Sequence, residues 1–292
     1  MNRMLTIALL TVQEARRRRV VLAGLIFGLG FLTVFVIGFG LIYRDLQLAP
    51  AARSIIPQGV GRNPATSAQT QAIFLEFVAM AGLYAVNFLT VMMAVLTPID
   101  TLSGEIQSGA IQSLVTKPAR RHDIVLGKWL GFWVLIAAYL LMMAGGVLLS
   151  VKLIGGLNVT NVPLGIGLML LEATVMLSLS IAGGARLSTL ANGVMGFGMF
   201  GLAFIGGWIE QIGTLVGNAT AENVGVITSL FAPSEAMWRL AAYNMQSPLL
   251  RELSFTPFTS ASVPSSAMIF WTLGYIVVVL AIGLRGFARR DL

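Results

Sequence analysis

The sequence predicts an all-α membrane protein with six transmembrane helices. Of its 292 residues, 57% are hydrophobic and only 11% are charged, whereas a soluble domain has roughly 25% charged residues. The mean hydropathy is +0.85, and the apolar residues fall in long blocks. Because about 20 apolar residues are enough for a helix to cross a bilayer, several of these blocks predict spans. No linker suggests a separate soluble domain, so we expect residues 1–292 to form one transmembrane domain.

Residues 1–19 predict an amphipathic helix that lies on the membrane surface. Met4, Leu5 and Ala8 recur at helical spacing, and a basic run follows at Arg16–Arg19. A secretory signal is the alternative, but the uncharged block at 20–43 has 24 residues, and a signal core has about 7–15. We therefore expect a retained first span.

The remaining spans follow from the other apolar blocks. The six predicted spans cover residues 20–43, 77–96, 129–151, 164–185, 190–209 and 268–284. The long link at 213–267 contains four prolines and several apolar residues, and it predicts short amphipathic helices on the bilayer surface, or dipping into it, before the last span. An even number of spans places both termini on the same side of the membrane.

The distribution of basic residues predicts the orientation. If the N-terminus is cytoplasmic, 13 of the 19 lysines and arginines lie in cytoplasmic segments, as the positive-inside rule requires. The net charge of +7 is then a consequence of topology. A nucleic-acid partner is not expected, because it would need a basic face on a folded soluble module. The chain has no cysteine, which excludes disulfides and thiol chemistry.

The most polar segment near the middle of the chain lies at 97–128, between the second and third spans. Thr97-Pro98-Ile99-Asp100 is typical of a helix start, and the proline in Thr116-Lys117-Pro118 disfavours helix in the residue before it. Two interpretations remain. The segment is either a surface helix with a solvated polar face, or a docking element for a soluble cytoplasmic partner.

Landmark residues in this segment resemble the type-2 family of ABC (ATP-binding cassette) transporter permeases. The landmarks are Ser103-Gly104-Glu105, Gly109, Leu114, Pro118, Arg120-Arg121 and Gly127-Lys128-Trp129-Leu130-Gly131. The resemblance implies a permease in a bacterial or archaeal cell membrane that pairs with a second copy and binds two cytoplasmic ATPase subunits. It also implies that the helix after the second span is the coupling element. By position, the candidate contacts to the ATPase are Glu105, Gln112, Arg120 and Arg121.

The chain itself carries no ATPase motif. Its Gly127-Lys128 pair is followed by Trp129, and His122 stands where a phosphate-binding loop needs glycine. We therefore expect no cofactor in this chain, with ATP and magnesium held by the partner ATPase. The second cytoplasmic link, at 186–189, is very short, so any second coupling contact must be small. Export is favoured over import because the sequence shows no sign of a dock for a substrate receptor.

Three polar residues within the spans are candidates for a translocation path: Glu172, Asn87 and Asn192. Glu172 lies near the centre of the fourth span, where a charge costs at least about 2.5 kcal/mol on insertion scales. It is therefore either a substrate or proton site, a gate, or a hydrogen-bonded packing residue. The two asparagines favour hydrogen bonds between helices. Glu210 lies at a span edge, where we expect its carboxylate to reach water.

Glycines in two spans favour close contact between helices, and the resemblance implies a dimer interface there. The candidates are Gly24, Gly28, Gly198 and Gly201. The 14 methionines raise the question of copper, since thioethers suit soft ions. Adjacent methionines point about 100° apart on a helix, so apolar filling is the favoured interpretation and no metal site is expected.

Three rival functions remain to be weighed against a permease. A membrane hydrolase is disfavoured, because the chain has one histidine and no cysteine. An ion-coupled secondary transporter that uses Glu172 is a nearer alternative, and an inert membrane anchor for a complex is another.

Overall fold

The computed structural model describes residues 3–48, 64–101, 104, 121–252 and 262–289, which are helical apart from short connections and contain no strand. The helices are α1 (Arg3–Ala15), α2 (Arg19–Leu48), α3 (Pro64–Leu96), α6 (Arg121–Gly155), α7 (Val162–Gly184), α8 (Thr189–Val216), α9 (Ala219–Phe231), α10 (Ser234–Met245), α11 (Pro248–Glu252) and α12 (Ala267–Ala288). Six of those described, α2, α3, α6, α7, α8 and α12, are long and apolar enough to cross a membrane. The predicted fold class is confirmed.

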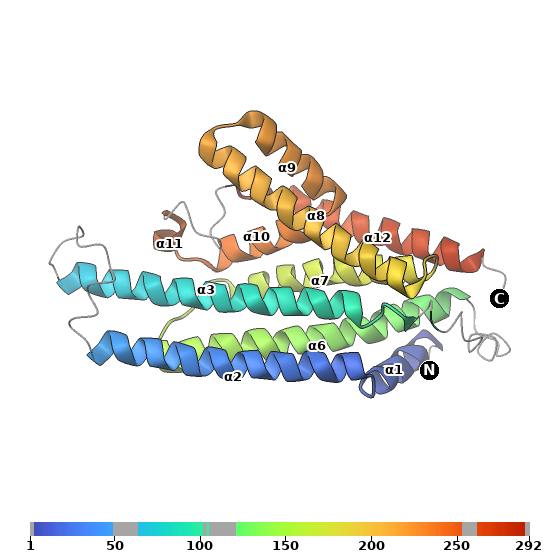
Figure 1. Cartoon of the computed structure of the whole chain (residues 1–292), viewed down its shortest axis with the longest axis horizontal. Coiled ribbons are helices and arrows are strands. Elements are labelled where there is room, and N and C mark those ends of the chain that lie inside the picture. The colour runs from blue at the N-terminus through green and yellow to red at the C-terminus, as the bar shows by residue number, and fades with distance from the viewer. Residues whose placement is uncertain (1–2, 49–63, 102–103, 105–120, 253–261, 290–292) are drawn as a thin grey trace.

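Helix α1 and the last residues of α12 lie at the same end of the bundle, while α11 lies at the opposite end (Figure 1). We call these the terminal end and the far end. Helix α3 also ends, and α6 begins, at the terminal end. This arrangement is what six spans require.

The observed helices are longer than the predicted spans. The span predicted at 129–151 is part of α6, which begins at Arg121 and ends at Gly155, and the span predicted at 77–96 is part of α3, which begins at Pro64. Hydropathy marks only the apolar middle of such a helix. Polar residues continue the helix beyond it, because backbone hydrogen bonding does not end where the apolar block ends.

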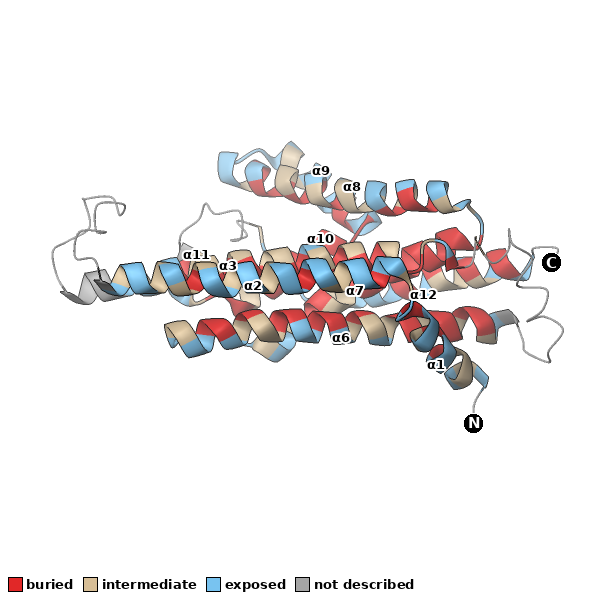
Figure 2. Cartoon of the chain, turned by 60° about the horizontal axis from the view of Figure 1, so that its bottom comes forward, coloured by how far each residue is buried: buried red, intermediate tan, exposed pale blue. Residues whose placement is uncertain are grey.

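Helix α7 forms the centre of the bundle and α2 lies at its edge. In α7, 72% of the most apolar window is buried, against 11% in α2. Helix α7 packs against α3, α6, α8, α10 and α12, so buried residues surround it on all sides, while the exposed face of α2 is apolar (Figure 2). An apolar face with no protein neighbour is what a lipid-facing helix presents.

The link before the last span folds back into the molecule. Helices α8 and α9 form an antiparallel hairpin that leans away from the other spans (Figure 1). Gly217 ends α8 with φ 69°, a left-handed conformation that glycine adopts without strain, and the Asn218 side chain caps α9. Helix α10 then returns against α7 and is buried along nearly its whole length. The link thus contains short helices, but α10 is part of the core.

Candidate functional site

At the terminal end, α1 lies against the start of α6 because two glycines leave room for it. A Cβ atom at Gly127 would stand 2.7 Å from the Ile7 Cβ atom, and one at Gly131 would stand 2.7 Å from the backbone oxygen of Ala8. Both distances are too short for any side chain. The two landmark glycines of the sequence therefore form the surface of α6 on which α1 packs.

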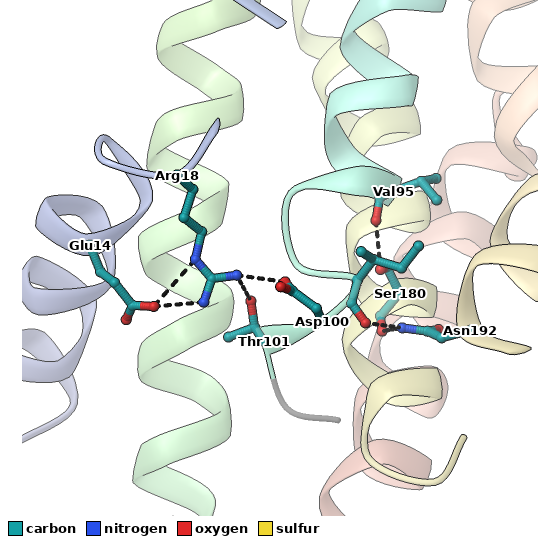
Figure 3. A network of polar contacts seen from close by, with 8 residues as sticks. Glu14, Arg18, Val95, Asp100, Thr101, Ser180 and Asn192 are labelled. Atoms are coloured by element: carbon teal, nitrogen blue, oxygen red, sulfur yellow. Dashed lines mark hydrogen bonds and ion pairs between the residues drawn. The ribbon is translucent and has the colours of Figure 1, made fainter. Parts of the chain in front are cut away.

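Arg18 ties α1 to the segment that follows α3 (Figure 3). Its Nη1 atom donates to the Asp100 carboxylate at 2.6 Å and to the Thr101 hydroxyl at 3.1 Å. Its Nη2 atom donates to the Glu14 carboxylate at 2.6 Å. The guanidinium thus contacts Glu14 nearby in the chain and Asp100, which lies 82 positions after Arg18. Arg18 was grouped with the basic run in the sequence, and nothing in that pattern identified its partners.

A second set of bonds ties the same segment to α7 and α8 (Figure 3). The Asn192 amide donates to the backbone oxygens of Ile99 at 3.1 Å and Ser180 at 2.9 Å. The Ser180 hydroxyl in turn donates to the Val95 backbone oxygen at 2.9 Å. Asn192 was a candidate for the translocation path. The structure places it at the terminal end, where it makes the contacts between helices expected of an intramembrane asparagine.

Of the predicted ATPase contacts, Glu105, Gln112 and Arg120 lie outside the described residues. Arg121 is described only as the first residue of α6. The described residues that flank this stretch, Asp100 and Thr101 on one side, belong to the Arg18 contacts.

Deeper in the bundle, Asn87 and Glu172 meet. The Asn87 amide on α3 donates to the Glu172 Oε2 atom on α7 at 2.9 Å. Glu172 is fully buried, and within the described part of the chain its Oε1 atom has no hydrogen-bond partner. The sequence named both residues without pairing them. One carboxylate oxygen thus accepts a hydrogen bond, and the other has none within the described residues.

Toward the far end, a buried ion pair joins α8 and α10. Arg239 Nη2 donates to Glu210 Oε2 at 2.8 Å, and both side chains are almost fully buried. The Ser262 hydroxyl donates to Glu210 Oε1 at 2.6 Å, and the Ser229 hydroxyl lies 3.5 Å from Oε2. The expectation that Glu210 reaches water is wrong, because α10 folds back and covers it. The signal that sequence reasoning missed is an acidic residue at the edge of the fifth span followed by a basic residue, Arg239, in the long link after it.

Glu235 lies one helical turn before Arg239 on α10. Burial raises the pKa of its carboxyl group to about 7, and the nearby Arg239 charge opposes this shift. Its side chain also packs against α8, since a Cβ atom at Gly207 would stand 2.7 Å from the Glu235 Cγ atom. The group therefore titrates near neutral pH from a buried position.

The four candidate interface glycines have two different environments. Gly24 packs against Met93 of α3, and a Cβ atom at Gly28 would stand 2.7 Å from the Tyr139 hydroxyl of α6. At Gly198 and Gly201 a Cβ atom would meet no described atom within 4 Å. The first pair serves packing within the chain, the second faces open space, and the dimer interface stays a prediction for all four. Over the described residues, no group of three or more His, Cys, Asp or Glu side chains could hold a metal ion.

Comparison with protein families gives one match over nearly the whole chain. Residues 5–292 match the family described as ABC-2 family transporter protein. No individually curated protein matches the chain.

Proposed function

Because the chain belongs to the ABC-2 transporter family, and so serves as a permease component of an ABC transporter, we propose that it exports its substrate with energy from ATP hydrolysis on separate ATPase subunits. Two copies of the chain form the pathway, and two ATPases bind at the terminal end. The residues from Thr97 to Lys128 carry the coupling contact, with Glu105, Gln112, Arg120 and Arg121 as its polar groups.

The observation that carries this proposal is the position of Ile99–Thr101. This short stretch contacts Arg18, in the turn between α1 and α2, on one side and Asn192 of α8 on the other, and Arg18 is in turn bonded to Glu14 of α1. A displacement of the segment that follows Thr101 would pull on both helices at once. Such a junction suits a coupling element, because rigid helices carry a small movement at one end to the middle of the bundle.

The basic residues support a cytoplasmic terminal end. Arg16–Arg19 lie between α1 and the start of α2, and Arg285 and Arg289 lie at the end of α12, both at the terminal end (Figure 1). Cytoplasmic segments carry an excess of Lys and Arg. The ATPases, which use cytoplasmic ATP, would then meet the same end as α1. Exported substrate would leave at the far end.

The proposal is tested by expressing the full chain with the ABC ATPase encoded nearest to it. We expect the two proteins to purify together and to hydrolyse ATP, and we expect Glu105→Ala with Arg121→Ala to lower that hydrolysis. Arg44→Ala, at the far end of α2, is the matched control. Substrate transport that runs at full rate on an ion gradient with no ATPase bound would overturn the proposal.

A second candidate, ion-coupled transport, is favoured by Glu172. A fully buried carboxyl group with one unpartnered oxygen among the described contacts is suited to carry a proton. The same assay separates the two candidates. Transport that needs a proton gradient and is abolished by Glu172→Gln supports the second, whereas transport that needs ATP and survives this substitution supports the first.

A further inference from the structure

A narrow groove lies between α2 and α6 near the terminal end, and α3 also contributes to its wall. Its volume is about 160 Å³, and an apolar cavity of about this size stays dry and accepts an apolar guest. The wall includes residues of all three helices: Val21 and Leu25 of α2, Leu135, Ala138 and Met142 of α6, and Met93 of α3. We call it the α2–α6 groove.

The open side of the α2–α6 groove faces the surroundings of the bundle. Ala138 and Met142 are exposed, whereas Met93 is buried, so the groove has a closed floor on α3 and an open edge on α6. Leu135, Ala138 and Met142 recur at helical spacing and extend the groove about 10 Å along α6. Because α6 crosses the membrane, acyl chains surround this open edge. The occupant is therefore apolar over this length.

Arg16 joins the groove to a basic surface. It lies on the wall of the α2–α6 groove and also, with Gln13 and Arg17, on the wall of a second pocket. A long basic side chain can cover apolar surface with its stem while its charged end stays in a polar medium. An apolar region and a basic region thus meet at one residue.

The charges of Arg16 and Arg17 are not matched within the described part of the chain. Both residues are exposed, and no ion pair or hydrogen bond among the described residues involves either side chain. Glu14, the acidic residue closest to them in sequence, already pairs with Arg18. Two adjacent cations without a counter-charge favour an anion from outside the chain.

The position of these arginines along the membrane normal agrees with the lipid head groups. The stretch 20–43 of α2 has 24 uncharged residues, which is about 36 Å along the helix and longer than the hydrocarbon core of about 30 Å. Arg16 and Arg17 precede this stretch, whereas Val21 and Leu25 belong to it. The basic surface is therefore at head-group level, and the groove lies beside the acyl chains of the same leaflet.

We propose that one anionic phospholipid of the leaflet at the terminal end binds here. Its phosphate oxygens accept hydrogen bonds from Arg16 and Arg17, and one acyl chain lies in the α2–α6 groove against Leu25 and Ala138. Each basic residue near a membrane surface contributes about a fivefold factor to the binding of anionic lipid. The proposal requires neither ATP nor substrate export, and it holds whichever side of the membrane the terminal end faces. It therefore stands or fails separately from the proposed function.

The test uses the full chain in nanodiscs with phosphatidylglycerol that carries a diazirine in one acyl chain. We expect the label on peptides that contain residues 21–25 and 135–142. Zwitterionic phosphatidylcholine with the same diazirine, at the same mole fraction, should label these peptides about fivefold less. Equal labelling by the two probes would overturn the proposal. Displacement of the label by excess inorganic phosphate would also overturn it, because the site would then be one for a free anion.

Substitutions of the two arginines test the head-group contact. Arg16→Gln with Arg17→Gln should lower labelling by phosphatidylglycerol about 25-fold, one fivefold factor for each residue, and Arg16→Lys with Arg17→Lys should retain most of it. The matched control is Arg285→Gln with Arg289→Gln, which removes the same charge from exposed positions at the end of α12. An equal loss in this control would assign the labelling to the general surface charge and not to the site.

A substitution in the α2–α6 groove tests the acyl-chain contact. Ala138→Trp fills the groove from an exposed position and should remove the label, whereas Leu149→Trp, exposed on the same helix and outside the groove, should leave it unchanged. Both variants should melt like the wild-type protein. Label that persists in Ala138→Trp would rule out this groove. No label in the wild-type protein, together with loss of the dimer in Ala138→Trp, would instead assign the groove to contact with a second copy of the chain.

Discussion

Asn87 on α3 and Glu172 on α7 are joined by a 2.9 Å hydrogen bond in the buried middle of the bundle. Both side chains are almost fully buried. The contact holds two spans together through a polar pair that water does not reach. Its strength decides whether Glu172 is a fixed packing group or a movable one.

Replacement of Asn87 should destabilise the permease. Asn87→Ala removes the described donor to a buried carboxyl group, and we expect a loss of about 1–2 kcal/mol. Glu172→Gln retains an oxygen that accepts from Asn87 and should be nearly neutral. Thermal unfolding in detergent measures both, with Asn223→Ala on the exposed face of α9 as control. Equal melting of Asn87→Ala and this control would show that the bond contributes nothing.

The Arg18 contact should affect coupling more than stability. The Arg18 side chain is 21% exposed and that of Asp100 is 55% exposed, and such pairs contribute about 0–1 kcal/mol. We expect Arg18→Asp to uncouple ATP hydrolysis from transport, and the exchange Arg18→Asp with Asp100→Arg to restore part of it. Arg17→Asp, at the exposed neighbouring position, is the control. An uncoupling of equal size in Arg17→Asp would mean that general basic charge, and not this contact, is responsible.

The packing of α1 on Gly127 and Gly131 of α6 gives a third prediction. A side chain at Gly131 would collide with the Ala8 backbone oxygen, which cannot rotate away, so Gly131→Val should displace α1 at a cost of about 1–3 kcal/mol. Trypsin cleavage within Arg16–Arg19 should then become faster. Gly145→Val, on the same helix in open space, should leave the cleavage rate unchanged. Unchanged cleavage in both variants would contradict the assigned packing.

The spans could be predicted from sequence because each depends only on the length of an apolar block. The pairing of Asn87 with Glu172 could not, because it depends on how α3 and α7 are rotated about their axes. The same holds for Arg18 and Asp100, whose contact follows from the seating of α1 on Gly127 and Gly131. The sequence shows which polar residues need hydrogen-bond or ion-pair partners. Which residues become those partners is determined by how the helices pack.

The far end was the least predictable part for a different reason. Helix α10 is too short to span, and its amphipathic pattern is equally typical of a helix on the membrane surface. The structure instead packs it against α7, which buries Arg239 beside Glu210. Helix α10 follows the break at Ala232 and Pro233 that ends α9, and such a break does not fix where the next helix packs.

The stability of the protein should fall as pH rises toward neutrality because of Glu235. Burial raises the pKa of this carboxyl group from 4.5 to about 7, although the Arg239 charge opposes the shift. Between these two values the folded state binds more protons than the unfolded state, so stability is fully present below about pH 4.5 and is lost up to about pH 7. Glu172 and Tyr84 lie within electrostatic range of the group. Melting temperatures over this range should flatten in Glu235→Gln. An equal slope in the variant would assign the pH dependence to another group.

The Glu210–Arg239 pair should be more sensitive to single than to double substitution. Arg239→Met leaves the Glu210 carboxylate buried without its counter-charge, which costs about 3–5 kcal/mol in comparable pairs. Adding Glu210→Gln removes that charge and keeps an oxygen that accepts from the Ser262 hydroxyl, now 2.6 Å from Oε1. The double variant should therefore melt above the single Arg239→Met variant. If the stability losses caused by Arg239→Met and by Glu210→Gln simply add in the double variant, the two residues are not coupled. The far end is then held together by the apolar packing of α10 on α7 alone.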